Sequence, residues 1–208
     1  MGKILTTTDF TGNNLLNTGN LYGYDTPAEH GMIEYNFPPL IASITNSFTS
    51  GRIYGISFTA QTSKSTGHVG VGVLSSASTP TAGQNLIGLY SISGTTATQV
   101  AVTSDLSTWG SQGFNSFAWT APFTLTAGQP YIVLFMSNAT TPVHLTGLST
   151  TTGFPASYNA GQSNTAAPWF NFFVQTNTGA TALPASYTIS GTTMTVTAAL
   201  TPWVGLAA

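Results

Sequence analysis

Tyr54-Gly-Ile-Ser-Phe-Thr-Ala60 is the stretch that decides the fold, because larger apolar residues alternate along it with small or polar ones. In an extended chain the apolar members share one face, while Gly55, Ser57 and Thr59 share the other. A repeat of two residues is the pattern of a β-strand. The stretch therefore predicts a strand with one face in a core and the other in solvent.

The same period recurs through most of the chain, and no amphipathic helix is evident. Residues tolerant of positive φ, such as Ser93-Gly94 and Ser190-Gly191, separate the periodic segments, as short hairpins require. We predict an all-β protein, an antiparallel two-sheet sandwich with jelly-roll-like connections. Besides the first stretch, strands are expected at 86–92, 98–103, 117–125, 131–137, 143–148, 169–175, 187–190 and 194–200.

Val69-Gly-Val-Gly-Val73 carries a further feature, because its valines alternate with glycines that have no side chain. One face of this strand is therefore bare backbone, which another chain segment or a ligand can approach closely. Tight packing within the sheet would also account for the two glycines. Both interpretations remain open on sequence alone.

The first 39 residues differ from the rest and predict an extended attachment arm. Gly and Asn punctuate isolated apolar residues there, and four of the five acidic groups lie between Asp9 and Glu34. Pro38-Pro39 favours extended backbone and marks a boundary. We therefore divide the chain into an arm, residues 1–39, and a β-sandwich domain, residues 40–208.

Charge is scarce, and its scarcity limits the function. Charged residues make up 4% of the chain, against roughly a quarter in ordinary globular proteins. With three Lys and Arg residues the chain lacks the basic surface that nucleic acids require. Its longest apolar runs are about six residues, too short to insert into a bilayer as helices. Cysteine is absent, which removes disulfides and thiolate sites.

Few side chains in this sequence could support catalysis or bind a metal ion. The main cluster of ionisable residues matches no known metal-ligand spacing, and we interpret it as a solvated acidic turn. It consists of Asp25, Glu29, His30 and Glu34. No metal or cofactor is therefore expected. Glycoside hydrolysis usually needs two carboxyl groups, and the sandwich domain offers Asp105 alone. We predict that the protein is not an enzyme. Asn138-Ala-Thr140 matches a glycosylation acceptor and is interpreted as a turn.

Two loops rich in Asn, Gln and Gly contain aromatic rings that could stack on sugars. The candidate glycan-binding residues are Asp105, Trp109, Phe114 and Asn115 in the first loop and Tyr158 and Asn159 in the second. Rings pack against sugar C–H faces while amides bind hydroxyls. Alternatively, the rings fold inward and cap the sandwich. Asp105 could anchor a sugar or close a turn.

Residues 86–136 carry a more specific pattern. Leu86-Ile-Gly-Leu-Tyr90 is followed by Trp109 and Trp119, and then by Ala121-Pro-Phe-Thr-Leu-Thr-Ala-Gly-Gln-Pro-Tyr131. This order resembles the β-sandwich domains of phage minor tail and tail-fibre proteins, especially those of phages that infect actinobacteria. Such domains carry a Gly-Leu-Tyr strand and a Pro-x-Thr-Leu-x-Ala-Gly-x-x-Tyr segment, which residues 122–131 match.

The resemblance implies a virion structural protein, a minor tail or fibre component on the outside of the tail or capsid. It implies contacts with other virion proteins, self-association as a homotrimer and attachment to a glycan of the host cell envelope. No catalytic motif comes with it. A head decoration or head-fibre protein, and a stand-alone carbohydrate-binding or adhesion module, are the alternatives that the same composition allows.

Overall fold

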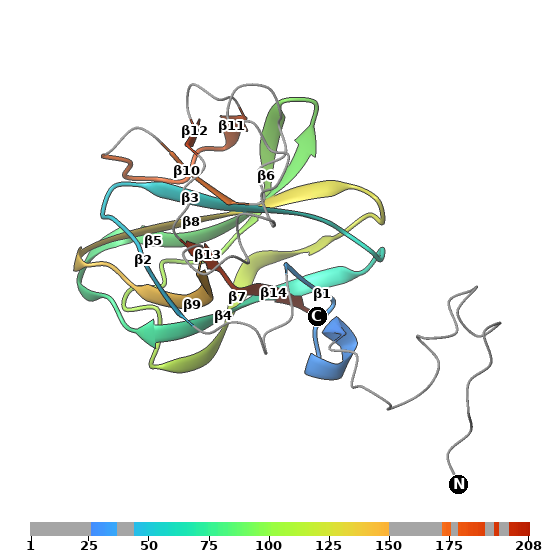
Figure 1. Ribbon diagram of the computed structural model, residues 1–208. Helices are drawn as coiled ribbons and strands as arrows, with labels where there is room; N and C mark the ends of the chain where they lie inside the picture. Colours follow the sequence, from blue (N-terminus) through green and yellow to red (C-terminus); the bar gives the residue numbers. More distant parts are fainter. Residues whose placement is uncertain (1–25, 37–43, 150–171, 176–178, 190–193, 196–199) are drawn as a thin grey trace, which may run out of the picture.

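The computed structural model describes residues 26–36, 44–149, 172–175, 179–189, 194–195 and 200–208. Within these ranges the chain forms strands and one 3-10 helix, η3 (Pro27–His30), and two antiparallel sheets pack against each other (Figure 1). The predicted β-sandwich is therefore confirmed. No helix in the described part is long and apolar enough to cross a bilayer.

Six strands form the centre of the sandwich: β3 (Ile53–Thr59), β4 (Ser65–Ser75), β5 (Ser78–Ser93), β6 (Thr96–Val102), β7 (Gly113–Thr124) and β8 (Pro130–Thr141). They pair from the inside outward, β5 with β6, β4 with β7 and β3 with β8. This nested order is typical of a jelly roll, in which a long hairpin folds over itself.

Shorter strands extend both sheets. Sheet B has the order β11-β6-β5-β8-β3-β10-β12, and sheet A has the order β1-β14-β4-β9-β13, with β2 beside β9 and β7 beside β4. The added strands are β1 (Glu34–Tyr35), β2 (Ile44–Ser47), β9 (His144–Ser149), β10 (Phe172–Gln175), β11 (Ser186–Thr188), β12 (Met194–Thr195), β13 (Leu200–Pro202) and β14 (Val204–Ala207).

The main core lies between the two sheets. Val69, Val71 and Val73 of β4 are at most 1% exposed and belong to one cluster with Ile56 and Phe135 of sheet B. The alternation of β4 therefore points its valines inward, so that its glycines lie on the outer face of sheet A.

Sheet B is buried on its outer face as well, which the sequence analysis did not expect. Gly55 and Ser57 of β3 were predicted to face solvent, and both are buried. A second cluster covers this face, in which Leu183 and Tyr187 pack on strands β3, β5, β6 and β8. The Tyr90 hydroxyl donates a hydrogen bond to the carbonyl of Pro184 over 2.7 Å and holds the covering segment in place.

Asn138 is a buried link between three parts of the chain and lies within β8, so its interpretation as a turn was wrong. Its Nδ2 donates to Gln84 Oε1 over 2.8 Å and to the Ala180 carbonyl over 2.7 Å. Its Oδ1 accepts a hydrogen bond from the Gly51 amide. Both ends of the side-chain amide are thus occupied in the folded protein.

Replacing Asn138 by Asp should lower the free energy of unfolding by about 2 to 4 kcal/mol, because a buried carboxylate would face the Ala180 carbonyl without a proton to share. The matched control is Asn115→Asp, since Asn115 donates from a solvent-exposed turn to the Ser111 and Gly113 carbonyls. That control should cost less than about 1 kcal/mol. Chemical denaturation of the two variants checks the difference, and equal losses would contradict the described network.

The described end of the predicted arm is joined to sheet A. Strand β1 pairs with β14, so that Glu34 lies opposite Leu206 and Tyr35 opposite Gly205. Figure 1 accordingly shows η3 and β1 beside the C-terminus. The division at residue 40 stays a prediction, because residues 37–43 lie outside the described residues.

Glu34 is 5% exposed, so the interpretation of residues 25–34 as a solvated acidic turn was wrong at this position. Its register opposite Leu206, a core residue, turns the carboxyl group inward. Burial raises the pKa of Glu34, and hydrogen bonds from the Gln61 amide, at 2.8 Å, and from the Tyr35 amide oppose that rise. The carboxyl group therefore fastens the N-terminal segment to the turn after β3.

This raised pKa gives stability a defined pH dependence. The folded protein keeps a proton on Glu34 to a higher pH than the unfolded chain, whose pKa is near 4.5. The resulting stabilisation is full below that pH and is lost as the pH rises through the raised pKa.

Glu34→Gln should remove this dependence, because a glutamine does not titrate. Its melting temperature relative to the unmodified protein should rise between pH 4 and pH 8. Thermal unfolding across that range measures the difference, in which the titrations of the other acids cancel. A difference that falls with pH would show that the buried carboxylate is favoured rather than penalised.

Candidate functional site

The outer face of sheet A has a floor without side chains. Gly70 and Gly72 of β4 lie on this face, and Gly205 of β14 is the register partner of Gly70. A Cβ at Gly70 would come within 2.7 Å of Phe114 Cε2, and one at Gly205 would collide with Met32 Sδ. Neighbouring side chains therefore lie directly on backbone, where a larger residue in the floor would displace them.

Trp203 forms the inner wall of this surface. It separates β13 from β14, and its amide donates to the Thr146 carbonyl over 2.9 Å. The indole is 3% exposed and belongs to a small cluster with Met32 and Tyr35, apart from the two larger cores. A break between two strands thus places an aromatic ring on the outside of the sheet.

Phe114 forms the rim. It lies opposite Gly72 in the register of β7 and β4, and its ring meets Trp203 edge to face with the ring centroids 5.9 Å apart. Its side chain is 59% exposed, and it is the exposed large hydrophobic residue among those described. A bulky apolar ring left in solvent beside a hollow marks a candidate contact surface.

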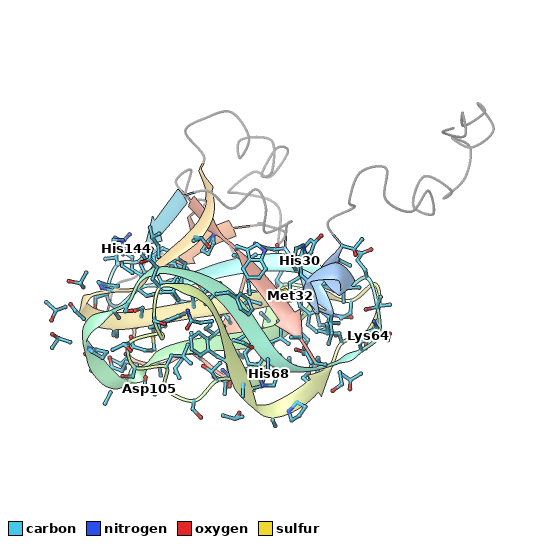
Figure 2. The ribbon with its side chains drawn as sticks, turned by 90° about the horizontal axis from the view of Figure 1, so that it is seen from below. His30, Met32, Lys64, His68, Asp105 and His144 are labelled. Atoms are coloured by element: carbon cyan, nitrogen blue, oxygen red, sulfur yellow. The ribbon has the colours of Figure 1, made fainter. Side chains whose placement is uncertain are left out.

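Gly72 of the floor, Trp203 of the wall and Phe114 of the rim line a pocket of about 470 Å³ that opens to solvent. Figure 2 shows His30 and Met32 together, both from the N-terminal segment. No lining residue carries a permanent charge, and the volume falls within the usual range of small-ligand sites. The pocket, which we call the Phe114 pocket, is lined by His30, Met32, Gly72, Val73, Gly113, Phe114, Thr146 and Trp203.

The lining of the Phe114 pocket combines apolar rings with a few uncharged polar groups. Rings supply apolar contact, and the Thr146 hydroxyl and the His30 imidazole supply polar groups. Thr146 Oγ1 lies 3.4 Å from the Gly72 carbonyl, a weak bond that a ligand hydroxyl can replace.

Trp109 lies in the core, which leaves its ring unable to reach a ligand. It is 0% exposed, and its ring packs edge to face on Phe48 and Phe117. A positive φ of 66° at Trp109 turns the chain so that the ring points inward. For this residue the inward-folding alternative describes the structure.

Asp105 and Asn115 hold turns rather than line the pocket. Asp105 is exposed, and its carboxylate accepts a hydrogen bond from the backbone amide of Asn85 over 3.0 Å. This bond closes the loop after β6. Asn115 donates to the Ser111 and Gly113 carbonyls and so shapes the turn just before Phe114. Figure 2 shows Asp105 well away from His30 and Met32. Tyr158 and Asn159 lie outside the described residues.

Four pocket residues were missed by the sequence analysis as parts of one site: His30, Met32, Thr146 and Trp203. The glycine alternation of residues 69–73 was the available signal, since it predicted a face open to close approach. The pattern could not identify the strand that pairs with β4, because Gly70 and Gly205 are neighbours in sheet A but lie far apart in the sequence.

The remaining ionisable groups do not converge. Among the described residues no three His, Asp or Glu side chains come together in a way that could hold a metal ion. The Nδ1 atom of His68 lies 2.8 Å from the main-chain oxygen of Ala208, at the far end of the β4–β14 pair.

Comparison with known proteins adds no relative from which a function could be transferred. No protein-family model matches the chain, and no curated protein matches it in sequence. The functional argument therefore rests on the fold and on the Phe114 pocket.

Proposed function

We propose that this chain is a virion structural protein, a minor tail or fibre component, that attaches to a neutral glycan of the host cell surface through the Phe114 pocket. The observation that carries the binding proposal is the exposed ring of Phe114 above a glycine floor. An apolar ring at the edge of a pocket that also contains a few polar groups is the usual composition of a small-ligand site.

A sugar ring matches the shape and polarity of this pocket. A pyranose has an apolar C–H face that can lie against a ring such as Phe114, and hydroxyls at its edge that need polar partners. Thr146 and His30 offer such partners, while no fixed charge favours a sulfated or carboxylated sugar. We therefore propose neutral rather than acidic glycans.

The proposed role is binding and not hydrolysis. Canonical glycosidases place two carboxyl groups around the scissile bond, and the lining residues of the Phe114 pocket include none. Glu34 is the acidic residue nearest in sequence to His30 and Met32 among those whose side chains are described. Its carboxyl group accepts the Gln61 amide and is buried.

The virion part of the proposal rests on the resemblance of residues 86–136 and on the scarcity of charge. A surface with few charges has little electrostatic repulsion and suits a protein packed among neighbours. The proposed partners are other virion proteins and further copies of this chain in a homotrimer. Antibody labelling of intact particles under the electron microscope tests this part, with tail labelling expected. Head labelling would favour a decoration protein, and no labelling would favour a stand-alone adhesion module.

Phe114→Ala should weaken glycan binding at least about tenfold, because it removes the ring on which the sugar stacks. Ser116→Ala is the matched control, since Ser116 is also exposed on β7 but does not line the pocket. A glycan array followed by calorimetry measures both variants. Both should melt within about two degrees of the unmodified protein, because neither exposed side chain supports the core.

Asp105→Asn separates the two candidate surfaces. It should leave glycan affinity unchanged, because Asp105 lies away from the Phe114 pocket. Loss of binding in this variant together with full binding by Phe114→Ala would move the site to the loop of residues 104–112. Binding of no neutral glycan by the unmodified protein would reject the proposal.

A further inference from the structure

We infer that the Phe114 pocket is a conditional site, which exists only while residues 26–36 lie on sheet A, and that Asn36 is the positioning residue that holds it together. The inference rests on the proposed function for its biological meaning, but its structural test does not. It assigns a regulatory role to the short segment that precedes the sandwich.

Asn36 brackets Trp203 with three hydrogen bonds. Its Nδ2 donates to the Pro202 carbonyl over 2.8 Å, and its Oδ1 accepts the Val204 amide over 3.0 Å. Its own amide donates to the Val204 carbonyl over 3.1 Å. The side-chain amide thus acts as a strand partner where β13 breaks into β14, and it fixes the backbone on both sides of Trp203.

The same segment builds one wall of the pocket. The Ile33 amide donates to the Leu206 carbonyl over 2.7 Å, and the Met32 amide donates to the Pro27 carbonyl over 2.8 Å. These bonds place Met32 against Trp203 and above Gly205 and bring His30 to the rim. If the segment left the sheet, the pocket would lose two lining residues and Trp203 would lose its cover.

Reciprocal coupling follows from this construction. A ligand that contacts Met32 or His30 favours the docked position of the segment. By linkage, docking of the segment raises ligand affinity by the same factor by which the ligand favours docking.

The test is methyl NMR of the full chain, labelled with ¹³C at its four methionine methyl groups. The Met32 signal, assigned from its loss in Met32→Leu, should lie upfield because the side chain packs against the Trp203 ring. Asn36→Ala should remove that upfield displacement. Asn36→Asp, which keeps the acceptor for Val204 but loses the donor to Pro202, should retain part of it.

Gln99→Ala is the matched control, because Gln99 also uses its side-chain amide, donating to the Tyr90 hydroxyl over 3.0 Å on sheet B. It should lower the melting temperature but leave the Met32 signal in place, which separates positioning from general stability. An unmoved Met32 signal in folded Asn36→Ala or Asn36→Asp would overturn the inference. The NMR test uses no ligand. Failure of glycan binding would therefore leave the NMR result valid, and an unmoved Met32 signal would leave the glycan-binding result valid.

Discussion

The structure depends on one steric constraint, the absence of side chains at Gly70, Gly72 and Gly205 on the outer face of sheet A. Because the valines between the β4 glycines fill the core, the same five residues of β4 build the interior and leave a bare surface outside. Trp203 and Phe114 can then lie against backbone. An alanine at Gly70 would already meet the Phe114 ring.

The few acidic side chains that are described have structural roles. Glu34, one of five acidic residues, is buried and bonds to a backbone amide, while Asp105 closes a loop through another backbone amide. Both acids whose side chains are described therefore stabilise the fold by accepting hydrogen bonds from backbone amides. The lining of the Phe114 pocket contains no acidic or basic side chain other than His30, and its rings and the Thr146 hydroxyl are the groups that a ligand would meet. An uncharged partner is the ligand class that such a surface suits.

Much of the fold could be predicted from local patterns, because the period of two in residues 54–60 and 69–73 requires only neighbouring residues. Contacts distant in sequence could not. The second cluster on sheet B depends on Leu183 and Tyr187, and the pocket depends on Asn36 meeting Val204. Trp109 shows a different limit, since a positive φ at one residue decides whether an aromatic loop residue points outward or inward.

The glycine floor of sheet A contributes Gly72 to the Phe114 pocket, and that pocket is the proposed ligand surface. Backbone amide NMR during titration with oligosaccharides released from the host envelope tests it most directly, because glycine amides report contact without any mutation. The account predicts the largest shifts at Gly72, Gly113, Phe114 and Thr146, which line the pocket. Shifts confined to the loop around Asp105, or a titration that leaves these four amides unchanged, would contradict it.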